Sequence, residues 1–118
     1  MSRSEFIRCL ISREGCRGLT LKKMARLMNL SPSRTAHVVK EETGESFSDM
    51  LRRCKNNFAA TLLRDTNFTI SEVAERCGFG STSQFHRSFR QEFGTSPLAY
   101  RKHEDGYTFQ SPLGRLPQ

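Results

Sequence analysis

Residues 69–94 have the sequence TISEVAERCGFGSTSQFHRSFRQEFG, which predicts two helices joined by a tight turn. Thr69 or Ser71 can cap the first helix, and Glu72 follows in its first turn, where a carboxylate interacts favourably with the helix N-terminus. The motif Gly78-Phe79-Gly80 then interrupts the helix, because glycine adopts turn conformations that a β-branched residue resists. The first helix is therefore short and ends at a glycine-containing turn.

The second helix of this stretch has an aromatic stripe and a polar outer face. Ser81 or Ser83 can cap it, and phenylalanines then recur every four residues at positions 85, 89 and 93. This period favours core packing over stacking of the rings on nucleic-acid bases. Side chains able to form hydrogen bonds lie between the rings: Gln84, His86, Arg87, Ser88 and Arg90. Two helices with a short glycine-containing turn and a polar second helix are typical of a helix-turn-helix unit.

Residues 20–44 repeat this organisation about fifty positions earlier in the chain. Thr20 precedes a short amphipathic stretch, and Ser31 stands before a proline, a combination that marks the start of a second helix. Ser31 corresponds to Ser81, and the helix-ending Gly44 corresponds to Gly94. An internal repeat of this kind predicts two helix-turn-helix units in one all-α chain.

The remaining segments predict a first helix over residues 4–14, a central helix over 46–64 and a last helix over 97–103. Ser46 and Asp49 match a capping box at the start of the central helix. The apolar stripe of that helix consists of Met50, Leu51, Cys54, Phe58, Leu62 and Leu63. Because no Pro- or Gly-rich linker interrupts it, we expect a stiff connection that fixes the distance between the units. The predicted double helix-turn-helix domain therefore spans residues 1–103, and residues 104–118 are expected to form a flexible tail.

The charge of the chain favours an acidic partner. Its 118 residues include 19 Lys and Arg against 12 Asp and Glu, a formal net charge of +7. A polyanion is the obvious partner of such a chain. The basic residues are spread along the sequence, so any positive patch must be made by folding. No apolar run is long enough for a membrane span or a signal peptide, which predicts a cytoplasmic location and no membrane partner.

The chain lacks the motifs of metal sites and common enzymes. Its four cysteines form no CxxC pair, and its three histidines do not complete a zinc-finger spacing. Cys54 and Cys77 fall on apolar helix faces, which favours buried small hydrophobic side chains. No GxSxG, HExxH or P-loop motif is present. We therefore expect neither catalysis nor a cofactor.

Two segments carry a family resemblance: ISEVAERCGF at residues 70–79 and FRQEFGTSPLAYR at 89–101. Together with the double unit, they resemble the DNA-binding domain of the AraC/XylS family over residues 5–103. The resemblance implies a bacterial transcription regulator, usually an activator, with seven helices. It implies that the third and sixth helices enter successive major-groove segments of double-stranded DNA. Many members carry an additional sensor domain, so the chain is either a small stand-alone regulator or part of a longer one. No small-molecule effector is expected to bind within it.

The resemblance also assigns candidate DNA contacts by position. In the second unit these are Thr82, Ser83, Gln84, His86 and Arg87, and in the first unit they are Ser33, Arg34, Ala36 and His37. Arg90 is expected to add to the attraction for phosphate. His37 stands where the family usually has an arginine, Thr35 and Val39 replace larger apolar residues, and Asn56 replaces a leucine. The first unit is therefore expected to contact DNA differently from the second.

Arg87 is the foremost candidate for base recognition. Its planar guanidinium matches O6 and N7 of guanine, and such a contact discriminates by ~1–3 kcal/mol. The alternatives are a phosphate contact or a surface ion pair with Glu75 or Glu92. Gln84 can bond to adenine through both amide atoms, or it can simply favour the helix. A competing function is a diverged module that binds DNA weakly and contacts RNA polymerase or another partner protein.

Overall fold

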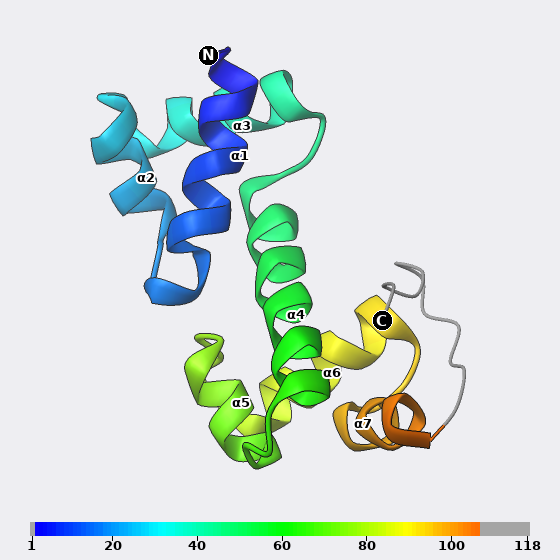
Figure 1. Cartoon of the computed structure of the whole chain (residues 1–118). Coiled ribbons are helices and arrows are strands. Elements are labelled where there is room, and N and C mark those ends of the chain that lie inside the picture. Colours follow the sequence, from blue (N-terminus) through cyan, green and yellow to red (C-terminus); the bar gives the residue numbers. More distant parts are fainter. Residues whose placement is uncertain (1, 107–118) are drawn as a thin grey trace. The chain divides into compact units, whose positions relative to one another are not determined.

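The computed structural model describes residues 2–106 and is all-α in that range, as predicted (Figure 1). The seven α-helices and one 3₁₀ turn are α1 (Arg3–Glu14), η1 (Gly15–Arg17), α2 (Leu21–Met28), α3 (Pro32–Thr43), α4 (Phe47–Asp65), α5 (Ile70–Arg76), α6 (Thr82–Phe93) and α7 (Pro97–Gly106). The helix-turn-helix pairs are α2 with α3 and α5 with α6, and α4 is the long helix between them. The predicted fold class is therefore confirmed.

The predicted helix ends agree with the structure to within a few residues. Thr69 and Ser81, rather than the alternatives Ser71 and Ser83, cap α5 and α6. The helix α7 continues through Gly106, so the first residues of the expected tail are helical. The rest of that tail, residues 107–118, lies outside the described range.

The chain divides into two compact units, Met1–Cys54 and Lys55–Gln118. The division falls inside α4, so the predicted connecting helix contributes residues to both units. The fixed distance expected between the two units stays a prediction.

The core of the first unit gathers one apolar face from each of its helices. Its buried side chains are Ile7, Leu10, Ile11, Leu19, Met24, Val38, Val39, Phe47 and Met50. The thiol of Cys54 donates a 3.3 Å hydrogen bond to the carbonyl of Ile11, which joins α4 to α1. A Cβ at Gly15 would lie 2.9 Å from the Cys54 sulfur, so a larger residue at position 15 would force the Cys54 side chain to move.

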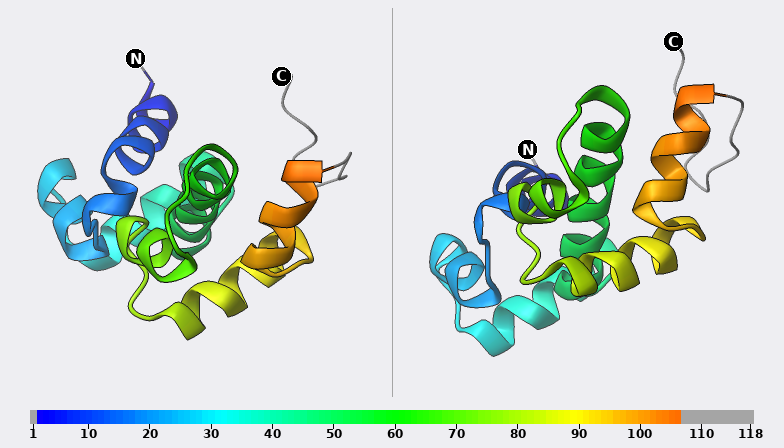
Figure 2. Two further views of the ribbon diagram at one scale, coloured as in Figure 1. Left: turned by 60° about the horizontal axis from the view of Figure 1, so that its bottom comes forward. Right: turned by 90° about the horizontal axis from the view of Figure 1, so that it is seen from below.

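The second unit is built on a chain of aromatic rings. Phe85 and Phe89 are fully buried, with ring centroids 5.6 Å apart, and Phe93 lies 4.5 Å beyond Phe89. Tyr100 of α7 packs edge-on against Phe89 at 5.4 Å. Figure 2 shows α7 following α6 through a short turn and leaving it at a steep angle. The ring contacts of Tyr100 with Phe89 and Phe93 join α7 to the stripe. The stripe predicted from the four-residue period is therefore confirmed.

The predicted apolar stripe of α4 is wrong at one position. Phe58 is 42% exposed, whereas Asn56, Ala59 and Ala60 are buried. The two alanines and the Asn56 amide thus take the buried positions of this part of α4, and Asn56 reaches Ser88 of α6 through a 3.0 Å hydrogen bond.

Candidate nucleic-acid interface

The second helices of the two pairs, α3 and α6, are held by the same capping bonds. The hydroxyls of Ser31 and Ser81 each accept a 3.1 Å hydrogen bond from a backbone N–H in the first helical turn. Gly44 and Gly94 end the helices with φ angles of +82° and +76°, and each donates a 2.8 Å bond to the backbone four residues earlier. A left-handed φ favours glycine at both ends. The correspondence between residues 20–44 and 69–94 is therefore present in the local geometry as well as in the sequence.

Burial along α3 and α6 follows one pattern. Thr35 and Val39 are fully buried at the positions that correspond to Phe85 and Phe89. The smaller residues of the first unit thus occupy core positions, although the hydroxyl of Thr35 has no hydrogen-bond partner in the described part of the chain. Val38 and Ser88, which also correspond to each other, are buried as well, so the two helices bury equivalent faces.

The predicted contact residues all lie on these outward faces. Ser33, Arg34, His37, Thr82, Ser83, Gln84, Arg87 and Arg90 are exposed, and Ala36 and His86 are half-buried. Each group therefore lies along one helix of its own unit. Ser88, which the sequence placed among the polar outer residues, is instead only 8% exposed and belongs to the interior of the second unit.

The turn between α5 and α6 is fixed by several contacts. Gly78 has a φ of +86°, and the N–H of Phe79 donates a 3.0 Å bond to the carbonyl of Ala74. The ammonium of Lys55 donates a 3.1 Å bond to the carbonyl of Gly78 and lies 5.7 Å from the Phe79 ring centre. Lys55 thus supports the turn that precedes α6.

Gln84 also interacts with the turn. Its side-chain oxygen accepts a 3.1 Å hydrogen bond from the N–H of Gly80. The side-chain NH₂ group of Gln84 takes no part in that hydrogen bond and can donate to another acceptor. A bond to adenine that used both amide atoms would make the same oxygen accept a second hydrogen bond, because one of its two lone pairs is already used by Gly80.

The corresponding positions His37 and Arg87 differ in their surroundings. His37 Nε2 lies 3.3 Å from a carboxylate oxygen of Glu41, one helical turn further along α3, and both side chains are more than half exposed. Arg87 forms no ion pair with Glu75, Glu92 or any other carboxylate among residues 2–106. The guanidinium of the second unit is therefore available to a ligand, whereas the imidazole of the first unit already faces an acid.

Several other basic groups near the helix starts are engaged within the protein. Arg52 pairs with Asp49 at 3.0 Å, and Arg53 pairs with Glu45. The hydrogen bond from Arg53 lowers the pKa of Glu45. At α5, a hydrogen bond from the Thr69 backbone N–H lowers the pKa of Glu72. The ion pairs of Arg52 and Arg53 neutralise part of the positive charge of α4, so less of that charge can attract DNA.

Among the helices that the structure describes, none combines the length and the apolar character that crossing a bilayer requires. No group of three or more His, Cys, Asp or Glu side chains among the described residues comes together in a way that could hold a metal ion.

The fold and the paired outward helices define a protein of the helix-turn-helix class. A model of the family described as "Helix-turn-helix domain" matches residues 24–103. The chain belongs to this AraC/XylS-type helix-turn-helix family, whose members are DNA-binding transcription regulators. The resemblance of residues 70–79 and 89–101 is thereby confirmed.

Individual relatives agree with this assignment. The xylose operon regulatory protein of Escherichia coli K12 is 30% identical over 91 residues, which are 77% of this chain and 23% of that protein. The transcriptional activator RhaS of Escherichia coli O139:H28 is 36% identical over 75 residues, or 63% of this chain and 27% of RhaS. The chain thus spans about a quarter of the length of these curated relatives.

A solved structure supports the fold over almost the whole chain. The C-terminal domain of AraT, a response regulator from Geobacillus stearothermophilus, is 31% identical and superposes with a TM-score of 0.78. The match covers 92% of this chain and 93% of that domain. The comparisons therefore favour a DNA-binding regulator over the competing hypothesis of a diverged protein-interaction module.

Proposed function

We propose that this chain binds a specific double-stranded DNA site by placing α3 and α6 in the major groove, and that α6 makes the more selective contacts. The observation that carries the proposal is the guanidinium of Arg87, which forms no ion pair among the described residues and lies on the exposed face of α6. Capping bonds hold both ends of α6, and Lys55 supports the turn before it. A fixed helix limits the entropy lost when its side chains are ordered on DNA. Arg87 is then the contact to guanine, and Gln84 and His86 contact neighbouring bases or phosphates.

The first unit is assigned a smaller share of base recognition. His37 pairs with Glu41, and Ala36 offers only a methyl group to a base. Arg34 and Ser33 are the remaining polar groups on the exposed start of α3. We assign Arg34 to a phosphate or base contact and Arg90 of the second unit to phosphate, which contributes to affinity without selecting a sequence.

The regulatory role follows from the relatives. RhaS is named as a transcriptional activator, and we propose activation for this chain as well, in the cytoplasm and with RNA polymerase as the protein partner. We assign no catalytic step and no effector to this chain.

The experiment that tests the proposal is selection of bound sequences from a random duplex pool by the wild type and by Arg87→Ala. We expect the variant to lose preference at one or two base pairs while its affinity for mixed-sequence DNA stays nearly constant. Arg90→Ala is the matched control, because it should weaken binding to all sequences. It should also reduce the slope of log affinity against log salt concentration by about one. Uniform weakening by Arg87→Ala would instead place that side chain on phosphate. A wild type that enriches no sequence would overturn specific binding altogether.

A further inference from the structure

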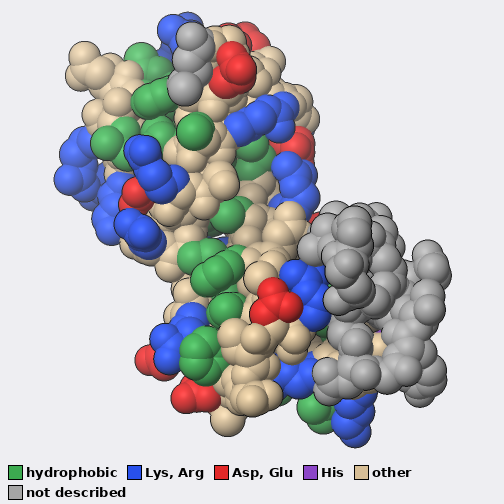
Figure 3. Space-filling model, viewed as in Figure 1, with side chains coloured by type: hydrophobic (Ala, Val, Ile, Leu, Met, Phe, Trp, Pro, Cys, Tyr) green, Lys and Arg blue, Asp and Glu red, His purple; other side chains and the backbone are tan. Residues whose placement is uncertain are grey.

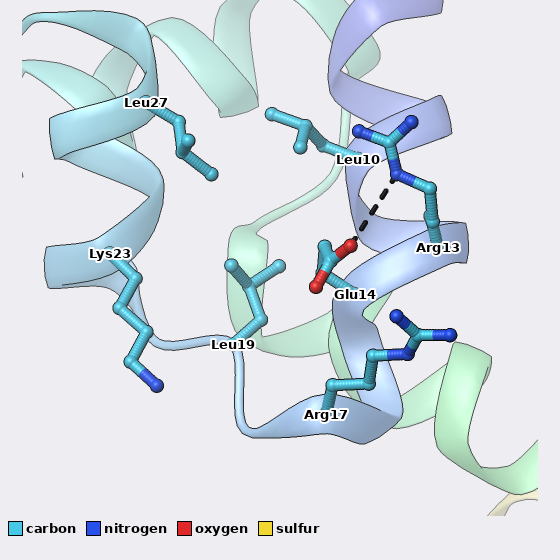
Figure 4. Close-up of a pocket in the computed structure, with 7 residues that line it drawn as sticks. All are labelled: Leu10, Arg13, Glu14, Arg17, Leu19, Lys23 and Leu27. Atoms are coloured by element: carbon cyan, nitrogen blue, oxygen red, sulfur yellow. Dashed lines mark ion pairs between the residues drawn. The ribbon is translucent and has the colours of Figure 1, made fainter.

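We propose that the first unit also carries a docking surface for a partner protein, which binds an acidic amphipathic segment of that partner. The surface is a pocket of about 230 Å³ where α1, η1 and α2 meet (Figure 4). None of its lining residues belongs to α3, the helix with the predicted DNA contacts of this unit. The inference therefore does not depend on how α3 and α6 recognise DNA.

The floor of the pocket is apolar. Leu10 of α1 and Leu19 of the segment before α2 are buried core residues, and Leu27 of α2 is 56% exposed. Figure 4 shows these three side chains directed toward the space between the two helices. A single exposed leucine on a surface is ordinary. Here the exposed leucine continues a concave apolar floor, so an apolar side chain inserted between the helices would cover all three residues together.

The rim of the pocket is positively charged. Arg13 is compensated by Glu14, with 3.4 Å between the guanidinium and the carboxylate. The ammonium of Lys23 donates a 3.2 Å hydrogen bond to the carbonyl of Gly18, which is a neutral acceptor and leaves the charge uncompensated. Arg17 has no ion pair with a carboxylate of residues 2–106. Two positive charges therefore flank the leucines without a counter-charge from the described part of the chain.

The surroundings extend this positive character. On the face shown in Figure 3, Lys and Arg side chains gather over α2 and the segment before it. Complementary charge accelerates association and disfavours partners of the wrong sign. The partner that fits has carboxylates placed on either side of an apolar residue.

The size of the pocket favours a peptide over a larger small molecule. Pockets for drug-sized ligands usually enclose about 300–1,000 Å³. A volume of about 230 Å³ holds one or two apolar side chains. An amphipathic helix can insert such side chains into a groove from one of its faces while its acidic residues reach the rim. The geometry thus matches a helical protein segment with leucine or phenylalanine on one face and glutamate or aspartate at the edges of that face.

The test is a titration of the full isotope-labelled chain, followed by NMR, with a designed helical peptide whose apolar face is Leu and whose flanking positions are Glu. A second peptide with Lys in place of Glu is the chemical control. We expect saturable shifts of Leu10, Leu19 and Leu27 with the acidic peptide and none with the basic one. Arg17→Glu and Leu27→Glu should each weaken binding by about tenfold or more, because they remove a rim charge and the exposed apolar contact.

Lys22→Glu is the matched control variant, since Lys22 is an exposed α2 residue outside the pocket lining and the change in net charge is the same. Equal weakening by Arg17→Glu and Lys22→Glu would overturn the proposal, because it would reduce the effect to general attraction. Shifts that avoid the leucines would also overturn it. A third result would overturn it as well: the acidic peptide does not bind, and Arg17→Glu lowers the DNA affinity more than Lys22→Glu does. That result would assign the rim to the DNA backbone. Circular dichroism of each variant verifies that the fold is retained.

Discussion

The side-chain nitrogen of Asn56 donates a 3.0 Å hydrogen bond to the hydroxyl of Ser88 inside the second unit. The same nitrogen lies 3.4 Å from the backbone carbonyl of Ser88. Asn56 is fully buried, and its amide oxygen has no partner among the described residues. The pair joins α4 to α6 at the level of the aromatic stripe, so one polar contact positions the helix that carries the proposed base contacts.

We expect Ser88→Ala to destabilise the protein more than Asn56→Leu/Ser88→Ala does. The single change leaves a buried amide with its shorter bond missing, which costs about 1–3 kcal/mol, whereas removal of both polar partners is close to neutral. Urea unfolding measures both free energies. Ser83→Ala, on the exposed face of the same helix, is the control and should change stability by less than about 0.5 kcal/mol. A double variant no more stable than Ser88→Ala would contradict this account.

The contrast between α6 and α4 explains how far the sequence predicts this fold. The four-residue spacing of Phe85, Phe89 and Phe93 predicted a buried stripe, and the caps of α3 and α6 followed from serine and glycine at the correct positions. Periodicity states which residues share a face. It does not state how wide the covered face is, since that depends on the elements packed against it. Asn56 and Phe58 are two residues apart on α4 and therefore point to nearly opposite sides of the helix. The structure buries the amide and leaves the ring 42% exposed, so the covered face at this point of α4 is not the one that the predicted stripe follows.

The candidate site shows the same limit. Sequence position was enough to place Arg34, Arg87 and their neighbours on outward faces. It gave no sign that Gln84 is bonded to the turn or that Lys55 supports it, because these contacts join residues whose backbones approach only in the folded unit. The prediction for Ser88 is wrong for a related reason, because the sequence alone places a polar residue inside an apolar period on the outer face.

Gln84→Glu separates the two roles of Gln84. The carboxylate can still accept the hydrogen bond from the N–H of Gly80, but it offers no donor to N7 of adenine. We expect stability to be retained and discrimination at one base pair to fall by ~1–3 kcal/mol. The readout is the ratio of specific to mixed-sequence affinity, because the added negative charge weakens both. An unchanged ratio would show that Gln84 serves the turn alone.

Thr69 should stabilise α5, whereas its neighbour Ser71 should not. The Thr69 hydroxyl accepts a 3.1 Å hydrogen bond from the N–H of Glu72, and Thr69 is the residue at the helix N-cap. Loss of such a cap costs about 1 kcal/mol. We therefore expect Thr69→Ala to lower the free energy of unfolding by that amount and Ser71→Ala to leave it nearly unchanged. Equal effects of the two alanine substitutions in urea unfolding would mean that capping at Thr69 does not decide the stability of α5.

The reciprocal bond of this capping box predicts an acid dependence. The Thr69 backbone N–H donates a 2.8 Å hydrogen bond to the Glu72 carboxylate, and this bond lowers the pKa of Glu72 below the ordinary 4.5. Because the folded-state pKa is the lower one, the stabilisation is present in full above the unfolded-state pKa and is lost as the pH falls through the folded-state pKa. We expect the urea midpoint to decrease below about pH 5, and Glu72→Gln to show a smaller decrease, since its amide does not titrate. Parallel pH profiles of the wild type and Glu72→Gln would show that this carboxylate does not contribute to the acid sensitivity of the fold.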